Sequence, residues 1–268
     1  MSEGHDESND YRVERKGSVW VFTINRAEQR NSLTWPIRFA LLRTVGEAEA
    51  DPDCGALIVT GAGDKAFCSG GDLRAKALAS ADQWPRDPMG RLRSIGEIVR
   101  CISTSPIVVI SAVNGAAFGG GCFLALAADI VVAHERARFG FGFSKRGLVP
   151  DWAGFFILPR LVGMARAKNL VLRGLTLDAQ AALQMGLIAE VVQTDVLAHA
   201  LEIGREIGSG ARVASAVSKQ VLAKSFETGL DGMLTYELLG QTIAIGTDDH
   251  REGVQSFLEK RPAVFKGK

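Results

Sequence analysis

The order of apolar and polar residues divides the chain into two unlike parts. In the first part, short apolar runs alternate with helical patterns. The runs suited to strands are 12–16, 18–24, 56–60 (ALIVT), 107–112 (IVVISA) and 129–133 (DIVVA). Helical periodicity is expected over 35–49 and 89–102. Such alternation is typical of an α/β core with right-handed crossovers.

Helical patterns dominate after about Met164. We expect helices over 164–172, 178–185, 194–208, 211–226, 229–243 and 248–259, with one short strand at 188–192. The first ten residues are polar and acidic, as in a flexible tail. The sequence therefore predicts a tail (1–10), an α/β core (11–205) and a C-terminal helical region for oligomerisation (206–268).

Two glycine-rich turns interrupt the α/β pattern. Gly119–Gly121 open an apolar segment after the strand that is expected to end at Ala112, and Gly70–Gly71 lie in FCSGGD after the strand 56–60. The first N–H groups of a helix have no intrahelical partner, and glycine lets a ligand oxygen approach them. Two converging N–H donors would form an oxyanion hole. The alternative is that both segments are only tight turns with positive φ.

A dinucleotide-binding turn is a second alternative. Gly61, Gly63 and Ala66 fit the pattern G-x-G-x-x-G/A after a strand, and Asp82 lies about twenty residues further on. No long apolar helix is expected to start at Gly63, however, because the chain continues into more glycines. This interpretation is therefore disfavoured.

Composition excludes several classes of function. The net charge of +1 creates no field that would favour nucleic acid or an anionic membrane. No apolar run reaches the roughly 20 residues of a membrane span. The cysteines at 54, 68, 101 and 122 show no CxxC spacing, and the histidines show no ligand spacing. We expect a reduced cytoplasmic protein with no metal and no redox cofactor.

Five segments together resemble one family. They are NRAEQRNSL (25–33), DKAFCSGGDL (64–73), VNGAAFGGGCFLALAADI (113–130), GLVPDWAGFFILPRLVG (147–163) and EGVQSFLEKR (252–261). In this order they are similar to the crotonase, or enoyl-CoA hydratase/isomerase, superfamily over about residues 12–265. The resemblance implies an α/β fold with a ββα spiral core and a homo-oligomer, usually a trimer or a dimer of trimers. It also implies an acyl-CoA thioester as substrate, with coenzyme A as part of the substrate and no separate cofactor.

The resemblance also assigns residues to binding. By motif position, the N–H groups of Gly71 and Gly120 would hold the thioester oxygen. The segment 64–73 would line the adenine and pantetheine, and its candidate binding residues are Ala66, Ser69, Gly70, Asp72 and Leu73. For Asp72 a structural role is favoured over a catalytic one, because its loop is occupied with coenzyme A. Arg26 and Arg30 would lie near coenzyme A, or on a solvated face. Apart from the resemblance, the mixed composition of 75–90 predicts a mobile loop that would serve as a lid.

The sequence departs from the family hydratases at two positions. These enzymes carry one glutamate after GGGC and a second in the segment that here reads FGFGFSKRG. This chain has Phe123 and Phe143 there. A phenyl ring neither accepts a proton nor orients a water molecule. Hydration by the two-glutamate route is therefore not expected.

Asp151, in VPDWAG, is the acid that remains in a suggestive place. In isomerases of the family this position carries an acid that faces the acyl chain. Nearby Phe123, Phe143, Trp152 and Phe155 would raise its pKa. Some of these side chains would line an apolar acyl pocket, together with others from the same part of the chain: Phe118, Phe139, Phe141 and Phe156. The alternative is a helix N-cap. We therefore expect double-bond isomerisation with Asp151 as acid and base. A hydratase or lyase with another acid pair, or an acyl-CoA-binding protein without chemistry, is the alternative.

Overall fold

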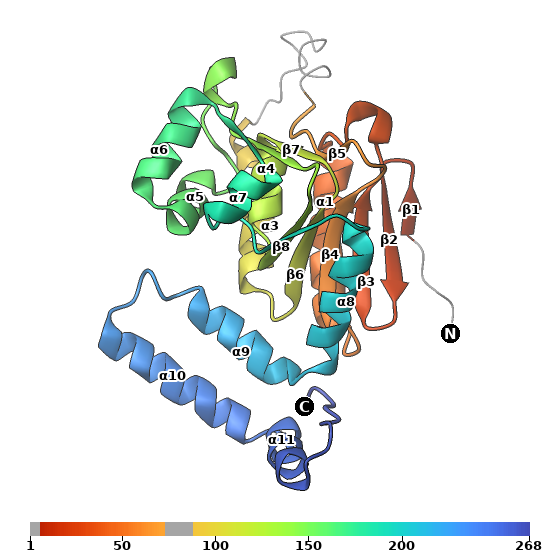
Figure 1. Ribbon diagram of the computed structural model, residues 1–268, viewed down its shortest axis with the longest axis vertical. Coiled ribbons are helices and arrows are strands. Elements are labelled where there is room, and N and C mark those ends of the chain that lie inside the picture. Colours follow the sequence, from red (N-terminus) through yellow and green to blue (C-terminus); the bar gives the residue numbers. More distant parts are fainter. Residues whose placement is uncertain (1–5, 73–87) are drawn as a thin grey trace.

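The computed structural model describes residues 6–72 and 88–268, with side chains at 9–72 and 93–268. Leu73, Asp82 and nearly all of the expected lid (75–90) lie outside the described residues. Figure 1 shows an α/β body with an arm of helices below it.

The larger sheet has seven strands in the order β1-β2-β3-β4-β6-β8-β11. They are β1 (Asp6–Ser8), β2 (Tyr11–Lys16), β3 (Val19–Ile24), β4 (Ala56–Gly61), β6 (Val108–Val113), β8 (Ile130–His134) and β11 (Glu190–Val192). The hairpin β2–β3 is antiparallel, and the strands from β3 to β11 are parallel. β4 is buried at all six positions. A strand covered on both faces reads as a continuous apolar run, so the sequence predicted β4 well.

A second sheet of four short strands was not predicted. Its order is β10-β9-β7-β5, and the strands are β5 (Ala66–Cys68), β7 (Ala116–Phe118), β9 (Arg138–Gly140) and β10 (Thr176–Asp178). The two glycine turns therefore follow β5 and β7, not β4 and β6 as expected. Three residues are too few to show a period, so the sequence did not reveal these strands.

The long helices lie close to their predicted ranges. They are α1 (Trp35–Ala50), α3 (Pro88–Thr104), α6 (Met164–Arg173), α7 (Ala179–Gln184), α8 (Val196–Ser209), α9 (Arg212–Leu222), α10 (Leu230–Ile245) and α11 (Asp248–Glu259). α9 ends four residues before its predicted end. The described residues also form two helices outside those ranges, α4 (Gly120–Leu126) and α5 (Gly154–Val162).

Two apolar clusters fill the α/β body. α8 covers one face of the larger sheet, where Ala200 and Leu201 pack with Val19, Ala56 and Ile110. The other cluster joins the opposite face to the second sheet and to helices that include α1, α3 and α4. α4 lies in the middle of the body in Figure 1 and is buried at every position.

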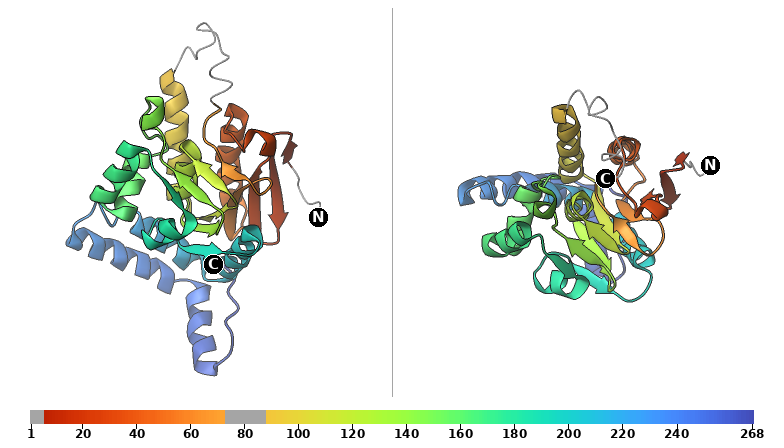
Figure 2. Two further views of the ribbon diagram at one scale, coloured as in Figure 1. Left: turned by 45° about the horizontal axis from the view of Figure 1, so that its top comes forward. Right: turned by 90° about the horizontal axis from the view of Figure 1, so that it is seen from above.

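Helices α9, α10 and α11 form the arm, which Figure 2 shows extending away from the body. The arm is tied to the body by Lys219, whose Nζ lies 2.7 Å from Asp129 Oδ2 and donates to the Ile107 carbonyl at 2.7 Å. Asp129 Oδ2 also accepts from the Val109 amide at 2.8 Å. The division into tail, core and C-terminal region remains a prediction.

Candidate active site

The structure brings the two glycine turns into contact. Gly70 has φ +87°, and a methyl group there would lie 2.8 Å from the Phe118 carbonyl oxygen and 3.1 Å from the Gly120 nitrogen. A methyl group on Gly121 would lie 2.2 Å from the Cys68 carbonyl oxygen. Only glycine permits so close an approach at Gly70 and Gly121. The end of β5 is therefore pressed against the start of α4.

The amides of Gly71 and Gly120 border this contact. Gly120 is the first residue of α4, so its N–H has no intrahelical acceptor. Gly71 forms a parallel bridge with Leu33, in which the Leu33 amide donates to the Gly70 carbonyl at 2.8 Å. Within the described residues, neither the Gly71 amide nor the Gly120 amide donates to another backbone oxygen. The arrangement is suited to two N–H donors that serve one ligand oxygen.

Two asparagines that the sequence did not single out hold the loop between β4 and β5. Asn31 is fully buried, and its Nδ2 donates to the carbonyls of Ala62 and Ala66 at 3.0 and 2.7 Å. Asn114 Nδ2 donates to Gly61 at 2.8 Å and to Gly63 at 2.6 Å. Asn31 has φ 54°, a conformation that asparagine tolerates better than most residues. The presence of an asparagine was therefore the one sequence clue to this turn, but it did not indicate which carbonyl groups the side chain binds.

The chain between β4 and β5 is not a dinucleotide-binding turn. β4 ends at Gly61, and the next regular element is the strand β5 rather than a helix. The phosphate site of the dinucleotide motif needs a helix N-terminus directly after the glycines. This agrees with the sequence analysis, which disfavoured that interpretation.

Arg26 is engaged within the protein rather than solvated. Its Nη1 donates to Ser32 Oγ at 2.7 Å and lies 3.3 Å from Asp72 Oδ2, and its Nε lies 3.4 Å from Asp10 Oδ1. The Arg26 side chain is 16% exposed. The ion pair between Arg26 and Asp72 thus stabilises the loop that carries Gly71. Arg30, by contrast, is exposed and has φ 52°.

Asp151 lies beside Gly120. A methyl group on Gly120 would be 3.5 Å from Asp151 Oδ1 and 2.8 Å from Trp152 Nε1. Asp151 is not the N-cap of α5: the N-cap of that helix is Ala153. The next two residues, Trp152 and Ala153, both have positive φ, at 53° and 54°. The N-cap interpretation of Asp151 is therefore wrong, and a strained turn aims this segment at α4.

Phenylalanines occupy the two positions at which family hydratases carry glutamate. Phe123 is fully buried, with its ring centroid 5.9 Å from that of Phe143 and 5.8 Å from that of Phe141. Phe143 is 7% exposed, and its Cζ would lie 3.8 Å from a methyl group on Gly119. A methyl group on Gly154 would lie 2.7 Å from the Phe123 ring. These rings form a packed apolar wall behind the start of α4.

The remaining predicted residues take different positions. Ala66 is buried and its carbonyl accepts from Asn31, so it braces the loop. Ser69 is half-buried, and its amide donates to Arg30 at 3.0 Å. Trp152 is 2% exposed. Of the other aromatic residues expected near the site, Phe139 and Phe141 are buried, whereas Phe118, Phe155 and Phe156 are exposed.

Cys68 lies at the end of β5, next to the glycine turn. Burial raises the pKa of its thiol to about 12. The thiolate is the nucleophilic form, and at neutral pH Cys68 is protonated. The cysteine beside the site is therefore a small packing residue, as expected, rather than a nucleophile.

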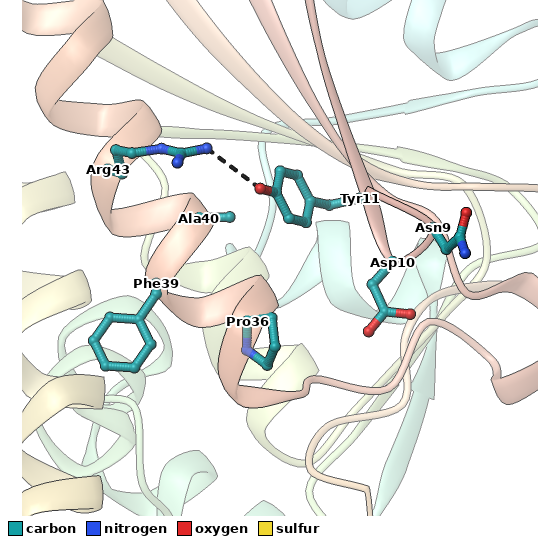
Figure 3. A pocket seen from close by; sticks show the side chains of 7 residues that line it. All are labelled: Asn9, Asp10, Tyr11, Pro36, Phe39, Ala40 and Arg43. Atoms are coloured by element: carbon teal, nitrogen blue, oxygen red, sulfur yellow. Dashed lines mark hydrogen bonds between the residues drawn. The ribbon is translucent and has the colours of Figure 1, made fainter. Parts of the chain in front are cut away.

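An open groove of about 590 Å³ lies elsewhere on the body, between β2 and the start of α1 (Figure 3). Its lining residues are Asn9, Asp10, Tyr11, Pro36, Phe39, Ala40 and Arg43. Neither glycine turn contributes to it, so we do not assign the chemistry there.

In the described part of the chain, no helix is long and apolar enough to cross a bilayer, and no three His, Cys, Asp or Glu side chains gather as metal ligands.

Comparison with known proteins defines the family. Residues 14–268 match the model of the enoyl-CoA hydratase/isomerase family. The chain is 37% identical to the 1,2-epoxyphenylacetyl-CoA isomerase of Escherichia coli over 93% of this chain and 95% of that protein. It is 34% identical to the short-chain-enoyl-CoA hydratase of Clostridium acetobutylicum, over 95% of this chain and 97% of that one.

Solved structures give the same result. The enoyl-CoA hydratase of Bacillus anthracis superposes with a TM-score of 0.90 at 32% identity, covering 97% of this chain and all of that chain. The chain belongs to the enoyl-CoA hydratase/isomerase family and has the crotonase fold, as the motifs predicted. It is an enzyme of that superfamily.

Proposed function

We propose that the protein isomerises an unsaturated or aromatic acyl-CoA through a thioester enolate, with Asp151 as the acid and base. The observation that carries this proposal is the position of Asp151 Oδ1 beside Gly120, while packed phenyl rings fill positions 123 and 143. A carboxylate next to an oxyanion hole can remove a proton from carbon. It can then return the proton to another carbon.

The steps follow from the geometry. The N–H groups of Gly71 and Gly120 donate to the thioester oxygen and stabilise the negative charge that develops on it. The Asp151 carboxylate takes a proton from the carbon chain, and the electron pair moves into the enolate. The same carboxyl group then protonates a carbon two positions further along, and the double bond moves. No water is added and no bond to coenzyme A is broken.

Hydration is the second candidate, because some of the relatives carry that name while another is named an isomerase. The Clostridium acetobutylicum protein and the Bacillus anthracis structure are both named enoyl-CoA hydratases. In this chain, however, Phe123 and Phe143 are buried and form a wall without a carboxylate. Hydration would need Asp151 and a different acid.

The decisive experiment replaces Asp151 by Asn, which keeps the size of the side chain and removes the base. A general base contributes about 10²–10⁴-fold, so we expect turnover to fall by that factor while acyl-CoA binding is retained. Asp53→Asn, at an exposed position, is the matched control and should leave turnover unchanged. Full turnover in Asp151→Asn would refute the role of Asp151. Tight binding without turnover in the parent protein would indicate an acyl-CoA-binding protein.

We also propose that the protein is a homo-oligomer that assembles through its arm. Large apolar side chains are more than half exposed along α9, α10 and the turn between them: Leu222, Phe226, Leu230, Leu234, Leu238, Leu239 and Ile243. An exposed apolar surface of this extent is typical of an interface. Light scattering should give a trimer or a dimer of trimers, and a monomer at micromolar concentration would contradict this.

A further inference from the structure

The first turn of α1 is attached to the glycine turn of the site. Leu33 pairs with Gly71, and its amide donates to the Gly70 carbonyl at 2.8 Å. α1 then begins at Trp35, so Arg38 lies one turn into the helix. Burial raises the pKa of the Cys68 thiol and has the largest effect, while the positive charge of Arg38 lowers that pKa. Arg38 therefore lies close enough to the end of β5 for its charge to act there.

The Arg38 guanidinium is placed against two indole rings. Its Cζ lies 5.7 Å from the centre of the Trp35 ring and 6.0 Å from that of Trp152. Both distances are within the range of cation–π attraction. The Arg38 Nε is buried. Trp35 is itself held by stacking on Phe39, with centroids 5.1 Å apart. Arg38 thus connects a ring on α1 with the ring next to Asp151.

Trp152 is in a conformation that needs support from its surroundings. A bulky residue with φ 53° is an outlier, and Ala153 with φ 54° follows it directly. Such strain persists only where neighbouring groups hold it, and it is typical of functional sites. The Trp152 ring lies under Gly120, where its Nε1 would be 2.8 Å from a methyl group. Arg38 contacts the same ring from α1.

We infer that Arg38 is a positioning residue of the active site: it holds the Trp152 ring against Gly120 and thereby fixes the carboxylate of Asp151 relative to the oxyanion hole. This inference rests on the proposed function. Arg38 acts on the carboxylate through the Trp152 ring, which its guanidinium contacts. Loss of Arg38 should disorder the turn 151–153 and lower kcat, with little effect on the binding of coenzyme A.

The test compares Arg38→Met with Arg38→Lys and with Arg43→Met. Methionine keeps most of the aliphatic length and removes the charge, whereas lysine keeps a cation for the rings. Arg43 lies on the same helix, half exposed and bonded to the Tyr11 hydroxyl and Glu47, so it is the matched control. A misplacement near 1 Å costs about 10²-fold, so kcat for Arg38→Met should fall 10- to 10²-fold with KM within about twofold. Arg38→Lys should recover most of the loss.

A second measurement does not depend on turnover. With 5-fluorotryptophan the chain gives four ¹⁹F resonances, one per tryptophan, and Trp152→Phe assigns that of Trp152. Arg38→Met should shift and broaden the Trp152 resonance, and Arg43→Met should leave it in place. An unchanged Trp152 resonance in Arg38→Met would overturn the inference, as would an equal loss of kcat in Arg43→Met. If the parent protein turns over no acyl-CoA, the proposed function fails separately, and the fluorine spectrum still decides whether Arg38 holds Trp152.

Discussion

A single methyl group added at Gly120 tests whether the start of α4 and the Asp151 turn form one unit. In Gly120→Ala the new methyl would lie 2.8 Å from Trp152 Nε1, 3.0 Å from Trp152 Cδ1 and 3.5 Å from Asp151 Oδ1. Trp152 is 2% exposed and has little room to retreat. Overpacking of this kind costs about 1–3 kcal/mol of folding free energy. Displacement of the Gly120 amide would also weaken one oxyanion donor, which is worth about 2.7–4 kcal/mol.

We therefore expect Gly120→Ala to lose about 10²-fold in enolate formation and about 1–3 kcal/mol in unfolding free energy. The assay is the exchange of acyl-CoA α-protons for deuterium, read by mass spectrometry, together with urea unfolding. The control is Gly46→Ala in the exposed face of α1, where a methyl group would meet nothing within 4 Å. That variant should gain about 0.5–1 kcal/mol and keep its activity. Undiminished exchange in Gly120→Ala would refute the placement of the oxyanion hole.

Three further outcomes follow from buried groups. Phe123→Glu should not restore hydration. It should destabilise the fold by about 4 kcal/mol, because a charge would enter a fully buried site. A stable Phe123→Glu variant that adds water to an enoyl-CoA would contradict this. Burial raises the pKa of Asp129 and lowers the pKa of Lys219. The attraction between the two charges opposes both shifts, but burial has the larger effect on each group. Lys219→Met should therefore lower the free energy of unfolding in urea by about 3–5 kcal/mol, because it leaves the Asp129 charge buried and unpaired. The double variant Lys219→Met with Asp129→Leu should recover more than half of that loss. A loss in the double variant equal to the sum of the two single losses would refute this. Cys68 should resist maleimide at pH 7.5 in the folded protein because its pKa is about 12, and rapid labelling seen in peptide mass spectra would show that the turn opens.

The sequence predicted the parts of the fold that carry a long pattern. The buried strand β4 and the long helices α1 and α8 repeat their apolar residues over enough positions to be recognised. The strands β5 and β7 have three residues each, and they are set by pairing with each other rather than by their own sequences. The site depends on these two short strands, because each one leads into a glycine turn.

The site was predictable as a set of positions but not as a set of contacts. The motifs indicated Gly71, Gly120 and Asp151, and the structure brings Asp151 next to Gly120. No local pattern indicated that Asn31 donates to the Ala66 carbonyl, 35 residues away. Nor did it show that Trp152 takes positive φ. Such features arise only when distant segments meet, so a local pattern does not encode them.

In the proposed reaction, Asp151 moves a proton between carbons and no water is added. We would incubate the parent protein and Asp151→Asn with a panel of unsaturated and aromatic acyl-CoAs in heavy water and analyse the products by mass spectrometry. We expect a moved double bond with deuterium on carbon in the parent, a loss of about 10²–10⁴-fold in Asp151→Asn, and no added water in either protein. Addition of water by the parent protein would contradict it, because it would show that hydration proceeds without carboxylates at positions 123 and 143.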